Sequence, residues 1–418
     1  MSEAPNDSRP VTITFDGDPV QAVEGESVAS ALIRAKTWSI ARSPKFHRPR
    51  GPSCFRSACD GCLARVGELP NQMTCMVPCR EGLRVSSQNV LGTRNLDLLR
   101  VTDWFFPEGM NHHELFAGVP GVSQVMQAFA RRVAGLGTLP HERIEPRPAA
   151  RMSIEALVIG AGASGFAAAI ALARRGMQVQ VVDDSLEAWG SARALPDDER
   201  ASFAKLEQDA AELCATGAIT VQLRTTAAGI FGNDVLLVGP QGASIVTATV
   251  TVLATGAHDG VLAFEGNDIP GVISARAAGW LLRQGISIGD RVLVAIAPGG
   301  GQWGEPFARA NQLAGHSTQL VYDVPVRAKG SSRVREVEFA SSEGNTAERA
   351  DALVIDAPPS PAYELCEQAG ATLVHTPAGF RVSERAIRPG FFATGEVLGM
   401  PLDARLFVES ARAIVASL

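Results

Sequence analysis

The chain has 418 residues, of which 46% are hydrophobic and 20% are charged, and its formal net charge is −6 at pH 7. This length predicts two or three domains with an ample core. Because the charge is acidic overall and both signs are interspersed, we expect no nucleic-acid partner, and we interpret the basic run at residues 42–50 as solvated. The chain shows neither a signal-peptide pattern nor an apolar stretch of about eighteen residues, so we expect a cytoplasmic protein that is not an integral membrane protein.

The first segments predict a small sheet with one helix. Residues 11–25 read as a β-hairpin, and residues 27–35 read as a short capped helix. Further strands are expected at residues 63–66 and 83–86. This order of elements is that of a β-grasp ferredoxin, and we assign residues 1–90 to such a domain.

A run of five cysteines is the most specific motif of the chain. Its members are Cys54, Cys59, Cys62, Cys75 and Cys79. The first three have the spacing C-x4-C-x2-C, which is that of a plant-type [2Fe–2S] ferredoxin loop. Small residues in this loop (Ser57, Ala58, Gly61) let the backbone wrap an inorganic core. Cys75 is the better fourth ligand, because a strand returning from a turn at residues 67–71 would bring it to the loop.

Two other kinds of site compete with the iron–sulfur interpretation. A structural zinc site usually has two C-x2-C pairs, and only one is present. Disulfides would require an oxidising compartment. We therefore predict a [2Fe–2S] cluster held by the thiolates of Cys54, Cys59, Cys62 and Cys75, with zinc and disulfides as the alternatives and Cys79 as a spare thiol.

Residues 91–150 are expected to form a connector with helices. The aromatic residues 104–106 are a candidate partner surface, and packing between domains is the equal alternative. The histidine pair at residues 112–113 is interpreted as surface or interface rather than a metal site. Prolines from Pro140 onward indicate a linker.

A complete βαβ unit follows the connector. Its parts are a buried strand at residues 154–159, a glycine turn at residues 160–165, a helix at residues 166–175 and a strand at residues 179–182. In the G-x-G-x-x-G turn, Gly160 makes the tight turn, Gly162 lets a pyrophosphate approach the backbone, and Gly165 lets helix and strand pack closely. The helix N-terminus would face the phosphates, and Asp183 is placed for a ribose hydroxyl. The unit predicts dinucleotide or adenine-nucleotide binding.

Two later segments complete a flavoprotein-like lobe. Residues 250–257 form a strand that enters a glycine turn, and residues 391–396 form a strand that ends at an acid, before a closing helix at residues 404–418. We assign residues 151–265 and 376–418 to this lobe. Its predicted cofactor-binding residues are Gly160, Ala161, Gly162, Ser164, Gly165, Asp183, Asp184, Thr255, Gly256, Gly395 and Glu396.

Residues 266–375 are expected to form a second, NAD-like lobe. It contains a βαβ-like unit over residues 292–322, but the glycine spacing at residues 298–304 departs from the motif. Pro298 stands where an N–H group that contacts a phosphate would be wanted. We interpret this unit as a structural half-domain rather than a working nicotinamide site.

Together these motifs resemble those of the α-subunits of heteromeric flavin-dependent amine oxidases and dehydrogenases. That group includes heterotetrameric sarcosine oxidase, opine oxidase, hydrogen cyanide synthase, and the D-hydroxyproline and L-proline dehydrogenases. The resemblance covers nearly the whole chain and is carried by residues 48–54, 75–85, 87–89, 135–140, 269–272 and the βαβ unit that ends at Asp184.

The resemblance implies a β-grasp [2Fe–2S] domain followed by a two-lobed Rossmann-type fold for FAD or NAD(P), so the expected fold class is α+β and α/β. It also implies a separate FAD-containing β-subunit that oxidises the amine, with further small subunits and an interface FMN in the group. The chain's own nucleotide would be FAD, with NAD or ATP as alternatives. Glu396 stands where many flavoproteins have Asp. Because the sequence ends at Leu418, we expect no folate-handling domain and only one cluster.

The function that follows is that of an electron-transfer subunit. Electrons from an amine or imino acid would pass from the partner's flavin through the cluster to an external acceptor. The residues suggest no acid–base constellation, so no catalytic residue is assigned to this chain. A self-sufficient NAD(P)H-dependent reductase and a non-redox scaffold are the alternatives.

Overall fold

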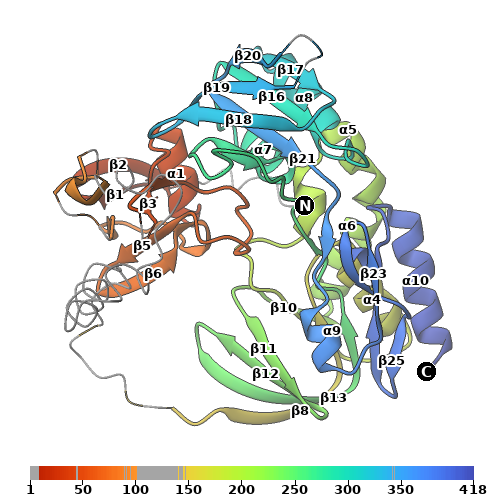
Figure 1. Ribbon diagram of the computed structural model, residues 1–418. Coiled ribbons are helices and arrows are strands. Elements are labelled where there is room, and N and C mark those ends of the chain that lie inside the picture. Colours follow the sequence, from red (N-terminus) through yellow and green to blue (C-terminus); the bar gives the residue numbers. More distant parts are fainter. Residues whose placement is uncertain are drawn as a thin grey trace, which may run out of the picture.

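The computed structural model describes residues 9–418 except residues 44–45, 89, 91, 95, 101–139, 141–144, 146, 341 and 343. It contains an N-terminal unit, a large mixed sheet with its helices, and a second parallel sheet (Figure 1). The predicted connector helices, the aromatic residues 104–106 and the histidine pair 112–113 lie outside the described residues.

The N-terminal unit is a five-stranded sheet in the order β2-β1-β7-β5-β6, with one helix packed against it. Its elements are β1 (Pro10–Phe15), β2 (Asp18–Val23), α1 (Val28–Arg34), β5 (Leu63–Val66), β6 (Leu69–Met73) and β7 (Arg84–Ser86). The predicted hairpin is therefore present. The predicted helix is present as well, and the hydroxyl of Ser27 accepts a hydrogen bond from the N–H of Ser30 at 3.0 Å. The hairpin of β5 and β6 returns the chain to Cys75, as the sequence predicted.

The prediction that the basic run is solvated is wrong for its first member. Arg42, in a two-strand pair of β3 (Ala41–Arg42) and β4 (Pro49–Arg50), is only 6% exposed. Its Nη1 donates to the carbonyl of His47 at 3.1 Å, and the buried His47 Nδ1 lies 3.0 Å from Asp97 Oδ2. Arg50 pairs with Asp268 at 2.6 Å. The acids that pair with His47 and Arg50 are distant in sequence, so the pattern of charge alone did not indicate the burial.

The large sheet has eight strands, and its parallel part carries the glycine turn. The strands are β8 (Ala150–Ile159), β9 (Val179–Val182), β10 (Ile219–Gln222), β11 (Thr226–Phe231), β12 (Asp234–Gly239), β13 (Gly242–Leu253), β25 (Ala386–Arg388) and β26 (Phe391–Ala393). Strands β8 and β13 begin well before the predicted residues 154 and 250. The reason is that residues 150–153 pair with residues 244–247, so the backbone ladder extends beyond the buried apolar run.

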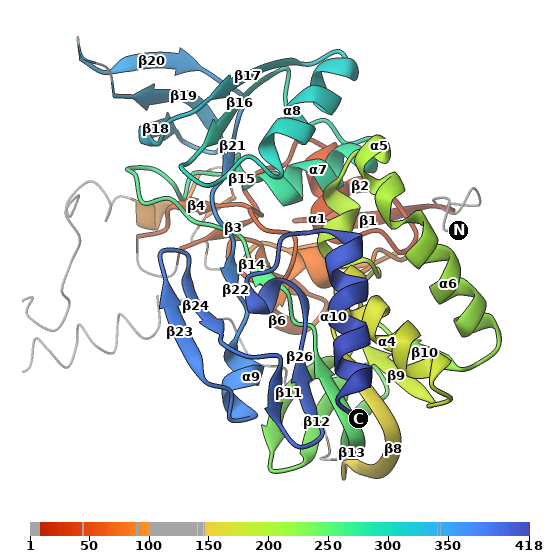
Figure 2. The same cartoon turned by 90° about the vertical axis from the view of Figure 1, so that its right-hand side faces the viewer.

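Three helices pack beside this sheet: α4 (Ala163–Arg174), α6 (Ala204–Ala215) and α10 (Ala404–Ala416). Figure 2 shows α10 lying beside α4. Phe166, Leu172, Phe407 and Ile414 are buried in the shared core. The remaining short elements of this region are α5 (Asp197–Arg200), β14 (Ala257–His258), β22 (Ser360–Pro361), α9 (Glu364–Gln368), β23 (Leu373–Thr376) and β24 (Gly379–Val382).

The second lobe is a parallel sheet in the order β15-β21-β16-β17 with an antiparallel sheet beside it. Its elements are β15 (Val272–Ser274), α7 (Ala275–Arg283), β16 (Arg291–Ile296), α8 (Gly304–Leu313), β17 (Ser317–Val321), β18 (Pro325–Gly330), β19 (Val334–Phe339), β20 (Thr346–Arg349) and β21 (Ala352–Asp356). The predicted strand–helix–strand order over residues 292–322 is present. The exact division of the chain into lobes stays a prediction.

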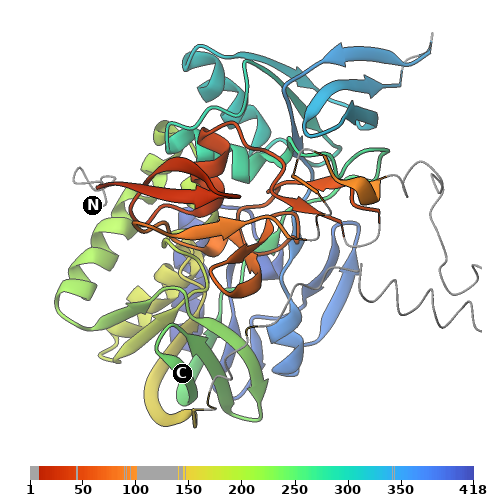
Figure 3. The same ribbon diagram turned by 90° about the vertical axis from the view of Figure 1, so that its left-hand side faces the viewer.

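The N-terminal unit lies directly against both other units (Figure 3), with the hydroxyl of Ser57 donating to Asp184 of the large-sheet unit and further contacts to the second lobe. The N–H of Ser274 donates to the carbonyl of Ser53 at 3.0 Å, and the rings of Phe55 and Trp280 lie 5.5 Å apart. A Cβ atom on Gly51 would lie 2.5 Å from the carbonyl oxygen of Trp38 and 3.0 Å from Cβ of Pro270 in the second lobe, so this position favours glycine. Within the described ranges, no helix has the length and apolar character needed to cross a membrane.

Candidate functional site

The cysteine loop brings the four predicted ligands together as two adjacent pairs. The Sγ atoms of Cys54 and Cys59 lie 3.3 Å apart, and the thiols of Cys62 and Cys75 are close enough that each shifts the pKa of the other. In the described part of the chain, no group of three or more His, Cys, Asp or Glu side chains is placed to hold one metal ion. Two thiol pairs suit a two-iron centre with two protein ligands on each iron, rather than one tetrahedral zinc.

The loop backbone is shaped to direct N–H groups at the sulfurs. Phe55 and Ser57 both have φ values in the left-handed region, 52° and 56°. The N–H of Arg56 lies 3.4 Å from Cys54 Sγ, and the backbone of Ser57 acts to lower the pKa of Cys75. A Cβ atom on Gly61 would collide with the carbonyl of Gly51, so a side chain there would push the loop away. Hydrogen bonds of this kind favour the thiolate form that iron requires.

The two thiols of the first pair differ in acidity, because the hydrogen bond between them raises the pKa of Cys54 and lowers that of Cys59. The pKa of Cys59 is lowered to about 6, first by the hydrogen bond from the Cys54 thiol and then by backbone N–H groups, including that of Gly61, against the opposing effect of burial. All seven cysteines are free thiols. The residues present therefore fit a [2Fe–2S] centre better than disulfides, and the assignment of these four ligands stays a proposal.

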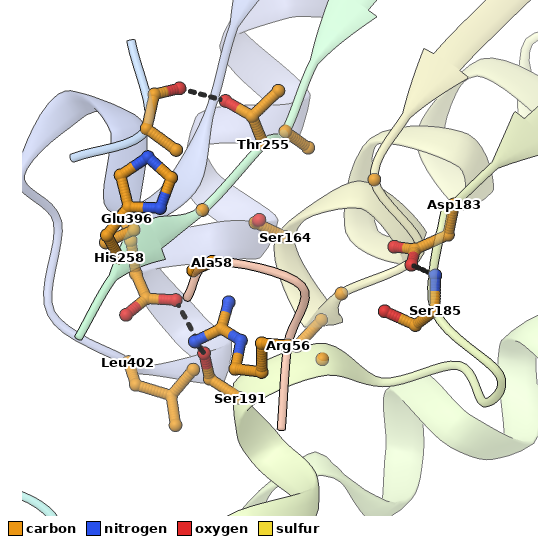
Figure 4. Close-up of a pocket in the computed structure, with 18 of the residues that line it drawn as sticks. Arg56, Ala58, Ser164, Asp183, Ser185, Ser191, Thr255, His258, Glu396 and Leu402 are labelled. Carbon is orange, nitrogen blue, oxygen red and sulfur yellow. Dashed lines mark hydrogen bonds between the residues drawn. The ribbon is translucent and has the colours of Figure 1, made fainter. Parts of the chain in front are cut away.

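Beside the loop lies a cavity of about 320 Å³. Eight of the eleven predicted cofactor-binding residues line it: Gly160, Gly162, Ser164, Asp183, Asp184, Thr255, Gly256 and Glu396. Figure 4 shows Asp183 and Ser185 at one end of the cavity and Glu396 and His258 at the other, with Ser164 and Arg56 between them. A volume of this size is within the range of small-molecule sites.

The three other predicted residues, Ala161, Gly165 and Gly395, shape the cavity without lining it. The N–H of Ala161 donates to Asp183 Oδ2 at 2.7 Å. A Cβ atom on Gly165 would collide with the carbonyl of Gly160, so glycine is required for the close packing of α4 on the turn. Gly395 has φ +84°, and a Cβ atom there would collide with the hydroxyl of Ser164.

Helix α4 begins at the cavity with its first N–H groups available. Its N-cap is Gly162, which offers no capping side chain, and Ala163 and Ser164 line the same space. A Cβ atom on Gly162 would meet nothing within 4 Å, so the turn is open on the side that faces the cavity. Backbone N–H groups and the helix dipole at such an N-terminus favour a phosphate. The residues therefore fit a nucleotide.

The two acids at the first end of the cavity are already engaged with protein groups. The Oδ1 atom of Asp183 accepts the N–H of Ser185 at 2.8 Å, while its Oδ2 accepts from the glycine turn. Asp184 Oδ2 accepts the hydroxyl of Ser57 from the cysteine loop at 2.9 Å. Burial, together with the charge of Asp183, raises the pKa of Asp184. The structure thus gives Asp183 a role in holding the turn, which the sequence did not indicate.

At the other end, a buried arginine links the second lobe to the cavity. Arg276 on α7 is 3% exposed, and its Nε lies 2.5 Å from Asp259 Oδ1. Its Nη1 lies 3.3 Å from Glu396 Oε1 and 3.1 Å from the hydroxyl of Ser191, which donates to Glu396 Oε2 at 3.0 Å. Glu396, predicted for a ribityl hydroxyl, is therefore part of an ion-pair network. Sequence reasoning missed Arg276, Asp259 and Ser191, because no motif joins these separate segments.

In the second lobe, the glycine-rich turn binds a carboxylate of the chain itself. Oδ2 of Asp356, at the end of β21, accepts hydrogen bonds from the N–H groups of Gly301 (3.0 Å), Trp303 (2.9 Å) and Gly304 (2.5 Å). These are the donors that a dinucleotide phosphate would need at the start of α8. The arrangement supports the interpretation of this lobe as a structural half-domain.

An Asp356→Ala chain is expected to lose about 3–5 kcal/mol of unfolding free energy, because three buried or half-buried donors lose their acceptor. Asp356→Asn should cost less, about 1–2 kcal/mol, because its amide oxygen still accepts. Urea denaturation measures both values, and Asp323→Asn, at an exposed acid of the same lobe, is the control.

The same variants carry a pH test. Burial is the main cause that raises the pKa of Asp356. A raised folded pKa contributes stability below the ordinary value, and this contribution is lost as the pH rises through the folded value. Asn cannot titrate, so the cost of Asp356→Asn should be larger at about pH 4, the ordinary pKa of an aspartate, than at about pH 8. An equal cost at both pH values would contradict this assignment.

Comparisons with known proteins match both halves of the chain. Residues 8–90 match the family described as 2Fe-2S iron-sulfur cluster binding domain, and residues 154–326 match the family described as pyridine nucleotide-disulphide oxidoreductase. The chain is 30% identical over 372 residues to sarcosine oxidase subunit alpha of Rhizobium meliloti (strain 1021), a match that covers 81% of this chain and 37% of that relative. It is 28% identical over 307 residues to sarcosine oxidase subunit alpha of Corynebacterium sp. (strain P-1), covering 68% and 28%. The chain thus spans well under half the length of either relative.

Solved structures show the same architecture. The L-proline dehydrogenase from P. horikoshii superposes with a TM-score of 0.72 at 18% identity, covering 99% of this chain and 75% of that chain. The thioredoxin reductase of T. acidophilum superposes with a TM-score of 0.50 at 16% identity, covering 63% of this chain and 98% of that chain. The predicted fold class is confirmed. The family matches also confirm the two predicted cofactor classes, a [2Fe–2S] cluster and FAD or another nucleotide.

Proposed function

Because the chain is a homologue of the sarcosine oxidase α-subunits that joins a [2Fe–2S] domain to a pyridine nucleotide-disulphide oxidoreductase fold, we propose that it is the electron-transfer subunit of a heteromeric amine dehydrogenase or oxidase. The complete activity would need a partner subunit whose FAD oxidises a secondary amine or imino acid. A [2Fe–2S] centre supplies one-electron transfer, which lets such a complex divide the electron pair taken by a flavin.

The observation that carries the proposal is the shared wall of the cysteine loop and the nucleotide cavity. Residues 56–58 belong to the loop and also line the cavity. The loop holds two thiol pairs with N–H groups directed at the sulfurs, and the cavity offers a glycine turn at the start of α4. The chain's own residues thus bind and position both groups.

The reductase alternative would require a nicotinamide site in the second lobe. The match to the pyridine nucleotide-disulphide oxidoreductase family favours this alternative in general terms. However, Asp356 engages the N–H groups that would hold a dinucleotide phosphate there. We therefore favour electron delivery by a partner subunit, with FAD, NAD or ATP in the main lobe and an interface FMN as a further cofactor.

The deciding experiment is anaerobic mixing of the purified chain with NADH. No prompt bleaching of flavin or cluster absorbance is expected without a partner, whereas the co-purified native complex should bleach when its amine substrate is added. Prompt reduction of the isolated chain by NADH would contradict the proposal and favour the reductase.

Mass spectrometry of the co-purified complex identifies the neighbouring chain and the extracted nucleotides. A complex with Cys59→Ala and Cys62→Ala that keeps full acceptor-linked turnover would instead favour a scaffold.

A further inference from the structure

The cysteine loop contributes one charged side chain to the nucleotide cavity. Arg56 stands between two of the predicted cluster ligands, Cys54 and Cys59, and lines the cavity together with Gly162 and Ser164. Figure 4 shows its side chain between Ser164 and Ser191. Arg56 therefore belongs to the cysteine loop and also lines the nucleotide cavity.

The guanidinium of Arg56 is half-buried and has donors to spare. Its Nη1 lies 3.4 Å from the hydroxyl of Ser191, and within the described residues no carboxylate oxygen lies within ion-pair distance of it. The nearby acids Asp259 and Glu396 are held by Arg276 instead. An anion beside this guanidinium would use its remaining donors, because arginine pairs well with phosphate oxygens.

The start of α4 offers a second group for the same anion. Its N-terminal residues Gly162, Ala163 and Ser164 line the cavity on the side of the glycine turn, and they carry no side-chain cap. A helix N-terminus and an arginine around one space form a site for a phosphate or diphosphate. We propose that Arg56 binds a phosphate group of the nucleotide in this cavity and thereby couples nucleotide binding to the cluster loop. This inference rests on the proposed function, since it takes the cavity as a nucleotide site and the loop as a cluster site.

The coupling follows from the backbone of Arg56. Its N–H donates to Cys54 Sγ at 3.4 Å, and its two neighbours, Phe55 and Ser57, have left-handed φ values that restrict how the loop can move. A phosphate that orders the Arg56 side chain also orders this N–H. Hydrogen bonds to the sulfurs are one of the determinants of cluster potential. By linkage, the state of the loop must affect nucleotide affinity in return.

The test uses ADP, the part that FAD, NAD and ATP have in common. The full chain, with its cluster intact and bound nucleotide removed, is titrated with ADP by calorimetry. Arg56→Ala is expected to weaken ADP binding by about 10- to 100-fold, the range for a lost hydrogen bond to a charged group. Arg56→Lys keeps the charge but loses the planar guanidinium, so its ADP affinity should lie between that of the wild type and that of Arg56→Ala. Arg80→Ala, at an exposed arginine of the same domain, should bind ADP as the wild type does.

A second readout does not depend on affinity. In the wild-type chain, ADP is expected to shift the electron paramagnetic resonance signal of the reduced cluster and to slow amide exchange at residues 54–59. Arg56→Ala at saturating ADP should show neither change. If the alanine variant fails to retain iron, Arg56→Gln replaces it. The wild-type comparison of amide exchange with and without ADP needs no variant and still tests the coupling.

The outcomes separate the inference from the proposed function. Wild-type protein that binds ADP, together with an Arg56→Ala chain that binds it equally well, overturns the inference and leaves the proposed function intact. ADP binding without any change in the cluster signal or in loop exchange also overturns it. A wild-type chain with no iron, or one that binds no ADP, contradicts the proposed function itself.

Discussion

A Cys75→Ser chain is expected to retain almost no iron, whereas a Cys79→Ser chain is expected to keep about two irons per chain, the content of one [2Fe–2S] cluster. Cys75 lies in the short helical turn Thr74–Met76, where its side chain meets that of Cys62. Cys79 packs instead among the buried side chains of the N-terminal sheet. The loss of one of four thiolates should prevent assembly, because the protein ligands must all be deprotonated sulfur for the cluster to be held.

The measurement is iron content together with the reduced-state paramagnetic signal of anaerobically prepared protein. Cys79→Ser is the matched control, because it changes a thiol four residues away. Burial raises the pKa of Cys79 to about 12, so this thiol stays protonated at neutral pH. The control should cost about 1–2 kcal/mol of stability, as for other small changes in a packed core. A Cys75→Ser chain that keeps its iron while Cys79→Ser loses it would show that the ligand assignment is wrong.

Arg276→Met is expected to lower the unfolding free energy at neutral pH by about 3–5 kcal/mol, the usual cost of leaving buried charge without its partner. The side chains of Arg276, Asp259 and Glu396 are 3%, 12% and 10% exposed, so water can compensate only weakly. Urea denaturation followed by circular dichroism measures the change. The matched control is Arg283→Met on the same helix, whose ion pair with the exposed Asp197 should contribute less than about 1 kcal/mol.

The same variant has a pH signature. Burial alone would raise the pKa of Asp259, but the charges of Arg276 and Arg56 overcome it and hold the pKa below its ordinary value. A lowered folded pKa contributes stability above the unfolded value, and this contribution is lost as the pH falls through the folded one. Without Arg276, burial should raise the pKa of Asp259, so that its contribution is lost as the pH rises. The cost of Arg276→Met should therefore shrink from neutral pH toward about pH 4. A cost that grows on acidification would contradict this account.

Local sequence patterns predicted most elements near the two cofactor sites, because their causes are local. The spacing of Cys54, Cys59 and Cys62, the glycine turn at residues 160–165 and the Ser27 cap each depend on neighbours within a few residues. The predicted first and last residues of the elements were less accurate than their type and order. Helix α4 begins at Ala163 rather than at residue 166, because the last part of the turn already has helical geometry.

The sequence by itself determined which motifs the chain contains. They are a ferredoxin-type cysteine loop, a glycine turn at the start of a helix, and a second glycine-rich unit whose spacing departs from G-x-G-x-x-G. Only the tertiary structure decided how these parts meet. It placed Arg56 in the nucleotide cavity, Arg276 between Asp259 and Glu396, and Asp356 on the second glycine turn. The physical reason is distance along the chain. These contacts join residues tens to hundreds of positions apart, and their energies depend on burial and charge that exist only after the sheets have packed.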